Sequence, residues 1–416
     1  MAPRTTEVPA PRLAPPKDLT IPERDSHTAR DVLSAAMRRL LVDFRHLAAR
    51  AAASPEDRAD VAAFARVVDH LYRSAPGPLV SALRRPTVGA LIRCARKALA
   101  GDGDVTQVPA LLRELRAVAL AEFAAAAALP GPTRLTRLPP RALCLGARAA
   151  LAIPEGTAAA TFANGALRLE APGGARDVPI EDSSYTDDIV SRPYHDIEGG
   201  VVLAEVDNNP LSMFEAHPDK SGNAIDLGGR APAEWVDVLR RCLDLVARHM
   251  PLLRNEMDLF LHQVVPVGYH AERHLSASYQ EAIGTIYMTL HPNLMTMTEA
   301  LIHEYSHNKL NALFELDGVL DNAFSPLYAS PVRPDPRPLH GIVLAVHAFQ
   351  PIARLYELMT EADEPVSKSP DFRRRFEQIR KVNRDGAEVV LGNGRPTPIG
   401  RGLLDEMRRW DDFFAK

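Results

Sequence analysis

One short motif in this chain of 416 residues could hold a metal ion, the string His303-Glu304-Tyr305-Ser306-His307. On an α-helix, residues four apart lie on one face, so His303 and His307 can present two imidazole nitrogens to one ion. Glu304 lies beside them and can reach the same ion or its water. A pair of hydrogen-bonded structural histidines is the alternative, because a pattern of this length also arises by chance. The readable start and end of the surrounding helix favour the metal site.

A third ligand must come from another part of the chain. The metzincin extension of the motif would need glycine at position 310 and histidine at 313, and Leu310 and Leu313 exclude that class. His340 and His347 are seven residues apart and therefore share one face of the next helix. We expect His347 to be the ligand, because an unpaired imidazole in its apolar segment would be unfavourable. His340, beside a proline-rich corner, is the alternative.

That corner, residues 330–339, has proline at alternate positions and carries Arg333 and Arg337. Proline restricts φ, so the segment should be stiff and extended and should hold both arginines in set directions. A guanidinium group suits bidentate capture of a carboxylate. The alternative is that these arginines form surface ion pairs with Asp335 and other acids.

Helices and strands can be assigned around these residues. The motif helix should run from Thr296 to Leu316, with a capping box formed by Thr296 and Glu299 and with Gly318 ending it. The remaining elements follow from apolar periodicity and breaker residues. We expect helical segments over 26–129, 233–253, 334–359, 371–382 and 403–414, and strands over 166–170, 201–206, 264–267 and 284–290.

These elements predict an α+β, helix-rich chain in which an N-terminal helical domain precedes a mixed α+β metal-binding catalytic domain. We place a disordered proline-rich arm at residues 1–25, the helical domain at 26–135 and the catalytic domain at 136–416. The role of the helical domain and the oligomeric state do not follow from these patterns.

Composition narrows the function classes. A formal net charge of −4 provides no global positive field for nucleic acid. The most apolar stretch, from Ala117 to Leu129, is too short to span a bilayer core of ~30 Å, so we expect no membrane partner and no signal peptide. Three cysteines far apart form no CxxC pair, which fits buried thiols in a reducing cytoplasm.

Several blocks together resemble the HExxH-motif peptide-modification family. The resemblance covers residues 182–359 and is far more specific than the HExxH pattern alone. The matching blocks are His303 to Leu313, Arg333 to Leu339, Val346 to Phe349, Glu215 to Ala224 and His274 to Tyr279. The first 135 residues contain no matching block. The resemblance implies an Fe(II)/2-oxoglutarate-dependent dioxygenase that hydroxylates the β-carbon of amino-acid side chains in ribosomally made peptides, during natural product biosynthesis.

The resemblance also implies roles for individual residues. His303, His307 and His347 would bind Fe(II), although the resemblance does not choose between His347 and His340. The open positions would take 2-oxoglutarate and O₂. Glu304 would bind the metal or orient one of its ligands. The distal carboxylate of 2-oxoglutarate would bind Arg337 first or Arg333 second, with Tyr279 or Ser278 as a helper hydroxyl.

Two other functions stay open. A zinc-dependent peptidase would use Glu304 as the general base for water, with Zn(II) as its metal. A peptide-binding accessory protein would use the histidines only to stabilise its fold. The oxygenase needs an arginine to bind its co-substrate 2-oxoglutarate, whereas a hydrolase does not. The expected partner of the oxygenase is a precursor peptide.

Overall fold

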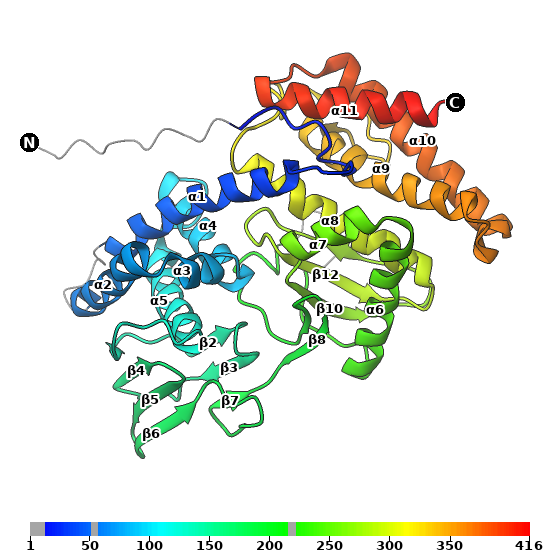
Figure 1. Cartoon of the computed structure of the whole chain (residues 1–416). Helices are drawn as coiled ribbons and strands as arrows, with labels where there is room; N and C mark the ends of the chain where they lie inside the picture. Colours follow the sequence, from blue (N-terminus) through cyan, green and yellow to red (C-terminus); the bar gives the residue numbers. More distant parts are fainter. Residues whose placement is uncertain (1–12, 51–56, 215–221) are drawn as a thin grey trace, which may run out of the picture. The chain divides into compact units, whose positions relative to one another are not determined.

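The structure is a computed structural model that describes residues 13–50, 57–214 and 222–416 (Figure 1). The fold is α+β and rich in helix, and a helical region precedes the strand-rich region, as the sequence predicts. The chain forms two compact units: residues 40–308 make up the larger one, and residues 309–416 with the segment before residue 40 make up the smaller one. None of the helices in the described ranges has both the length and the apolar composition that crossing a membrane requires.

The chain begins with consecutive helices. They are α1 (Thr28–Ala49), α2 (Arg58–Ser74), α3 (Pro76–Leu83), α4 (Pro86–Ala100), the 3₁₀ turn η2 (Val105–Gln107) and α5 (Val108–Ala125). Proline in the first turn starts α3, α4 and α5, where a missing N–H does no harm. Gly101, with φ of 95°, ends α4 in the left-handed conformation.

Helix α5 joins this helical region to the strands that follow. Most of its residues are buried, and it packs against β2 (Arg141–Cys144), β4 (Ala159–Ala163) and β5 (Ala166–Ala171). Helices and strands therefore share one core within the larger unit. The predicted domain boundary at residue 135 does not coincide with a boundary between the compact units, because this packing crosses it.

Two small antiparallel sheets follow α5. The first has the order β1-β4-β5-β6 and the second β2-β3-β7. Their remaining strands are β1 (Thr133–Leu135), β3 (Ala149–Ala152), β6 (Gly174–Pro179) and β7 (Val190–Ser191). The predicted strand at 166–170 is thus confirmed as β5.

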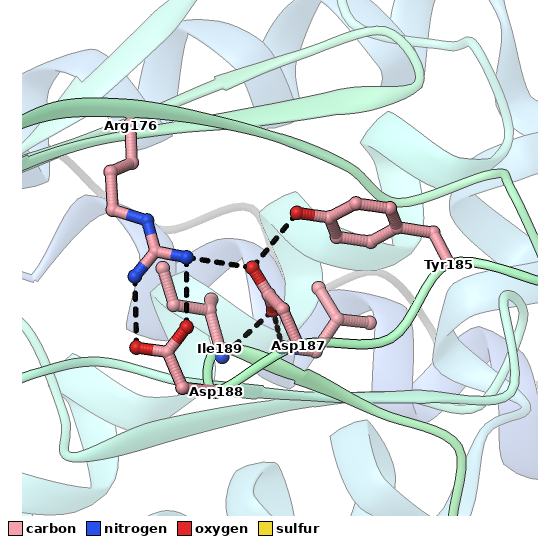
Figure 2. A network of polar contacts seen from close by, with 6 residues as sticks. Arg176, Tyr185, Asp187, Asp188 and Ile189 are labelled. Atoms are coloured by element: carbon pink, nitrogen blue, oxygen red, sulfur yellow. Dashed lines mark hydrogen bonds and ion pairs between the residues drawn. The ribbon is translucent and has the colours of Figure 1, made fainter.

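A polar network links β6 to the turn before β7 (Figure 2). Arg176 forms ion pairs with Asp187 and Asp188, each at 2.8 Å, and the hydroxyl of Tyr185 donates to Asp187 at 2.8 Å. The other oxygen of Asp187 accepts from the backbone N–H of Ile189 at 2.8 Å. Because the network is largely exposed, we expect it to stabilise the shape of the turn more than the fold.

A five-stranded sheet of order β11-β12-β10-β9-β8 follows the two small sheets in the larger unit. Strand β10 runs parallel to both β9 and β12, and β8 and β11 are antiparallel edge strands. Every residue of β9 and β12 is buried, which is typical of strands covered on both faces. The strands are β8 (Tyr194–Glu198), β9 (Val201–Ala204), β10 (Gln263–Tyr269), β11 (Ser276–Ala277) and β12 (Thr285–Leu290).

Two helices connect β9 to β10. The sequence predicts one helix over 233–253, but the structure has α6 (Pro232–His249) and α7 (Pro251–Phe260). Pro251 explains the break, because proline cannot donate the hydrogen bond that would continue α6. Helix α6 packs against β8 and β9. The three cysteines, Cys94, Cys144 and Cys242, are free and buried, as predicted.

The smaller unit is built mainly from helices near the C-terminus (orange to red in Figure 1). Helix α10 packs on both α9 and α11. The elements of the smaller unit are the hairpin strands β13 (Leu327–Tyr328) and β14 (Arg337–Pro338), α9 (Leu339–Glu361), the 3₁₀ turn η3 (Pro365–Lys368), α10 (Pro370–Asn393) and α11 (Pro398–Phe414). The sequence predicts the end of α10 near residue 382, but the helix continues to Asn393.

The segment before α1 differs from the prediction of a disordered arm over residues 1–25. Residues 1–12 lie outside the described part of the chain. In the described part, Leu19 is fully buried, and the backbone N–H groups of Thr20 and Ile21 donate to the carboxylate of Glu406 in α11 at 3.0 and 3.1 Å. Residues 13–25 are therefore packed within the smaller unit, because a buried carboxylate of α11 binds their backbone.

Candidate metal centre

The predicted motif lies on α8 (Leu294–Phe314). The helix begins two residues before the predicted start, because the side-chain oxygen of Asn293 accepts from the backbone N–H groups of Met295 and Thr296 at 2.8 and 3.2 Å. Asn293, and not Thr296, is therefore the capping residue. The helix also ends at Phe314, before the predicted end at Leu316 and well before Gly318.

His303 and His307 lie together on α8, as their spacing predicts. Their ring centroids are 4.4 Å apart and the ring planes are inclined by 72°. Both side chains are half-buried, so the rings are neither fully enclosed in the core nor fully exposed to solvent. Two neighbouring imidazoles of this kind can supply two nitrogen ligands to one metal ion.

Glu304 is the acidic residue of the motif. It is only 3% exposed, and its Oε1 accepts a hydrogen bond from the Ser276 hydroxyl at 2.7 Å. Its Oε2 is buried, and within the described residues it has no hydrogen-bond partner. A buried carboxylate oxygen without a partner is unfavourable by about 1–3 kcal/mol, so it indicates a missing water or ion. The donor types at this site therefore fit a bound metal ion.

The rotation of α8 about its axis is set by polar contacts within the larger unit. Tyr305 donates to the buried carboxylate of Glu256 at 3.1 Å. Burial first, and then Glu256, raise the pKa of Tyr305 well above its usual range, so its hydroxyl stays protonated and can donate. Because Tyr305 is anchored in the core, the orientation of α8 is fixed. The directions in which His303 and His307 leave the helix are then fixed as well.

The helper hydroxyls predicted for a co-substrate have different surroundings. The hydroxyl of Tyr279 donates to the backbone oxygen of Phe214 at 2.8 Å and accepts from the Asn223 side chain at 2.6 Å. It therefore joins two chain segments on either side of residues 215–221, the part of one family-like block that lies outside the described residues. The hydroxyl of Ser278 is buried and has no hydrogen-bond partner among the described residues, whereas the hydroxyl of Tyr279 is engaged.

Arg333, Arg337, His340 and His347 belong to the smaller unit. Arg333 forms an ion pair with Asp335 at 2.8 Å, and this hydrogen bond is the main cause that lowers the pKa of Asp335. The alternative predicted for Arg333, surface ion pairing, is thus the arrangement found. Arg337 lies in β14, and its charge also contributes to the lowered pKa of Asp335. Its role as the carboxylate ligand stays a prediction.

The two candidate third ligands also differ. The ring of His340 packs against two phenylalanine rings, with centroids 4.4 Å from Phe314 and 5.1 Å from Phe324. His347 is fully buried in α9. Stacking gives His340 a packing role that needs no metal, whereas the choice of His347 as third ligand stays a prediction.

Over residues 13–50, 57–214 and 222–416, no three histidine, cysteine or acidic side chains are arranged closely enough to hold a metal ion. Within the larger unit, the donors brought together are thus the imidazole pair of His303 and His307, and the carboxylate of Glu304 does not join them in a three-donor group among the described residues. Sequence reasoning missed the contact between Ser276 and Glu304. The alternation of Ser276 and Ser278 in a predicted family block was the signal that could have identified it.

Comparison with known proteins adds no assignment. No family model matches this sequence, and no curated protein sequence matches it. The function must therefore be argued from the residues and their geometry.

Proposed function

We propose that this protein is an Fe(II)/2-oxoglutarate-dependent dioxygenase that hydroxylates the β-carbon of an amino-acid side chain in a ribosomally made peptide. The observation that carries the proposal is the imidazole pair of His303 and His307, whose ring centroids are 4.4 Å apart. Glu304, the residue after His303, has a buried Oε2 without a hydrogen-bond partner among the described residues. The family-like sequence blocks support the reaction class. His347, ahead of His340, is the predicted third nitrogen ligand.

When bound, Fe(II) would supply the chemistry for hydroxylating a C–H bond, with O₂ as the oxidant and 2-oxoglutarate as the co-substrate that is oxidised to succinate and CO₂. His303 and His307 would hold the ion. Glu304 would use its Oε2 to bind the metal or to orient one of its ligands. Arg337 would bind the distal carboxylate of the co-substrate through charge-assisted hydrogen bonds. Ser278 would add a neutral hydrogen bond to the same group, ahead of Tyr279, whose hydroxyl is already engaged.

A zinc-dependent peptidase is the second candidate, and the same observation favours it. Oε2 of Glu304, which is buried and has no hydrogen-bond partner among the described residues, could also act as the general base for a water molecule. An arginine at position 337 favours the oxygenase, because hydrolysis does not require a cation for a co-substrate carboxylate. An accessory peptide-binding protein would need neither group.

We further propose that the protein is cytoplasmic and that its partner is a precursor peptide. Nucleic acid and membranes are not among the proposed partners. Free, buried cysteines support a reducing compartment. The formal net charge of −4 supports a partner other than nucleic acid.

The test is anaerobic reconstitution with Fe(II), followed by 2-oxoglutarate. We expect a weak visible charge-transfer band from chelation of the keto acid, and release of succinate once O₂ is admitted, slowly even without peptide. His303→Ala and His307→Ala should each lose the metal and the band while circular dichroism stays unchanged. His46→Ala, at an exposed position of α1, is the matched control and should retain both.

A different result would assign the peptidase. If Fe(II) gives neither band nor succinate, while the zinc-loaded protein cleaves peptides, the oxygenase is excluded and Glu304 becomes a general base. If His303→Ala retains a full equivalent of metal, the motif is not the metal site in either enzyme.

A further inference from the structure

Ser276 makes a contact that the proposed chemistry does not by itself require. It lies in β11, and its hydroxyl donates to Oε1 of Glu304 at 2.7 Å, across 28 positions of sequence. The contact occurs inside the larger unit, between an edge strand of the central sheet and the motif helix α8. A hydroxyl that donates to one oxygen of a carboxylate restricts rotation of the whole group.

Strand β11 holds Ser276 in a defined position. Ser276 is paired with Met288 of β12, and Ala277 with Tyr287. Just before β11, Leu275 and Thr289 are joined by two backbone-directed contacts: the N–H of Leu275 donates to the Thr289 hydroxyl at 3.0 Å, and the N–H of Thr289 donates to the Leu275 carbonyl at 2.9 Å. Because successive side chains of a strand point to opposite faces, this register determines that the Ser276 hydroxyl reaches α8.

The two oxygens of Glu304 are therefore not equivalent. Oε1 has a hydrogen-bond donor, and Oε2 is buried without a partner among the described residues. Without the serine, the carboxylate could turn about its last bond and exchange the two oxygens. With the serine in place, one oxygen is selected and the other remains available for an ion or a water molecule.

We infer that Ser276 is a positioning residue that holds Glu304 through Oε1 and presents Oε2 to the metal ion or to a water next to it. This inference rests on the proposed metal site but applies to either reaction class. In this role Ser276 acts through Glu304. A purely structural role, in which the serine only satisfies a buried carboxylate, is the competing explanation.

Binding of Co(II) to the intact, metal-free protein tests the inference. Ser276→Ala and Ser276→Val both remove the donor, and valine suits a strand, so at least one should fold. We expect each to weaken Co(II) affinity about ten- to a hundredfold and to shift the visible d–d bands, since partners of metal ligands typically contribute that much. Ser276→Thr, which keeps the hydroxyl, should restore the affinity and the spectrum.

Thr289→Val is the matched control, because it removes a hydroxyl that supports β11 but does not touch Glu304. It should lower thermal stability and leave the Co(II) spectrum unchanged. If Thr289→Val reduces affinity as much as Ser276→Ala does, the role of Ser276 is structural and the inference fails. It also fails, with the metal site intact, if Ser276→Ala and Ser276→Val bind Co(II) like the wild type. A wild-type protein that binds no Co(II) overturns the proposed function itself.

Discussion

The side-chain oxygen of Asn308 accepts a hydrogen bond from the backbone N–H of Gly284 at 2.6 Å. The amide nitrogen of Asn308 donates to the carbonyl oxygens of Thr285 and Glu304, at 3.2 and 2.9 Å. Asn308 is fully buried, and Gly284 has a φ of 105°, in the region that favours glycine. The side chain next to His307 thus attaches α8 to the start of β12 and to its own preceding turn.

Replacing Asn308 should therefore destabilise the protein strongly. Asn308→Ala removes three buried hydrogen bonds and leaves the N–H of Gly284 without an acceptor, so we expect a loss of about 2–4 kcal/mol in the free energy of unfolding. Asn393→Ala is the control, because Asn393 is exposed and donates only to the Val389 carbonyl in the described structure. Denaturant unfolding measures both variants, and equal losses would contradict the anchoring role of Asn308.

The two histidines of α9 should respond in opposite ways to replacement. His347→Ala should reduce metal retention, because His347 is the predicted third ligand. His340→Ala should retain the metal but lose about 1 kcal/mol of stability, since the stacking with Phe314 and Phe324 disappears. Metal content after dialysis and thermal unfolding of each variant distinguish these effects. Metal loss in His340→Ala alone would reverse the assignment.

The two arginines of the proline-rich corner offer a similar pair. Arg337→Ala should raise the apparent constant for 2-oxoglutarate by roughly ten- to a thousandfold, as expected for the loss of a charge-assisted bidentate contact. Arg333→Ala should change it little, because Arg333 is paired with Asp335. Succinate release against 2-oxoglutarate concentration gives both values, and metal affinity should stay constant. An unchanged response of Arg337→Ala would transfer the role to another residue.

Glu406 predicts a pH dependence of stability. Burial is the main cause that raises its pKa to about 7, opposed by the N–H donors of Thr20 and Ile21 and by Lys309, and reinforced by Asp18. Because the pKa is raised above its usual 4.5, the stability that the protonated form contributes is complete below pH 4.5. That stability decreases as the pH rises through 7, by on the order of 3 kcal/mol in total.

The measurement is chemical unfolding at several pH values between 4.5 and 8. Glu406→Gln should abolish this part of the pH dependence, because glutamine does not ionise. Asp405→Asn is the control at the exposed neighbouring position, where the side chain only pairs with Arg408. An identical pH profile for Glu406→Gln and the wild type would show that Glu406 does not titrate in this range.

The sequence by itself determines the local part of this fold. The spacing of His303 and His307 places both rings on one face of α8, because helix periodicity depends only on neighbouring residues. The apolar runs at 264–267 and 284–290 likewise determine β10 and β12, which are buried strands of the central sheet. Helix ends were less predictable, since Asn293 and Thr296 are both good caps and only one of them is used.

The tertiary structure alone decides which distant groups meet. Ser276 binds Glu304 across 28 positions, and Thr20 binds Glu406 across 386, a contact that orders a segment whose composition predicts disorder. Neither contact has a periodic signal, because a hydrogen bond between remote segments depends on how sheets and helices pack and not on local pattern. The residues that could bind a metal were thus readable from the chain, whereas the serine that selects one oxygen of Glu304 was visible only after folding.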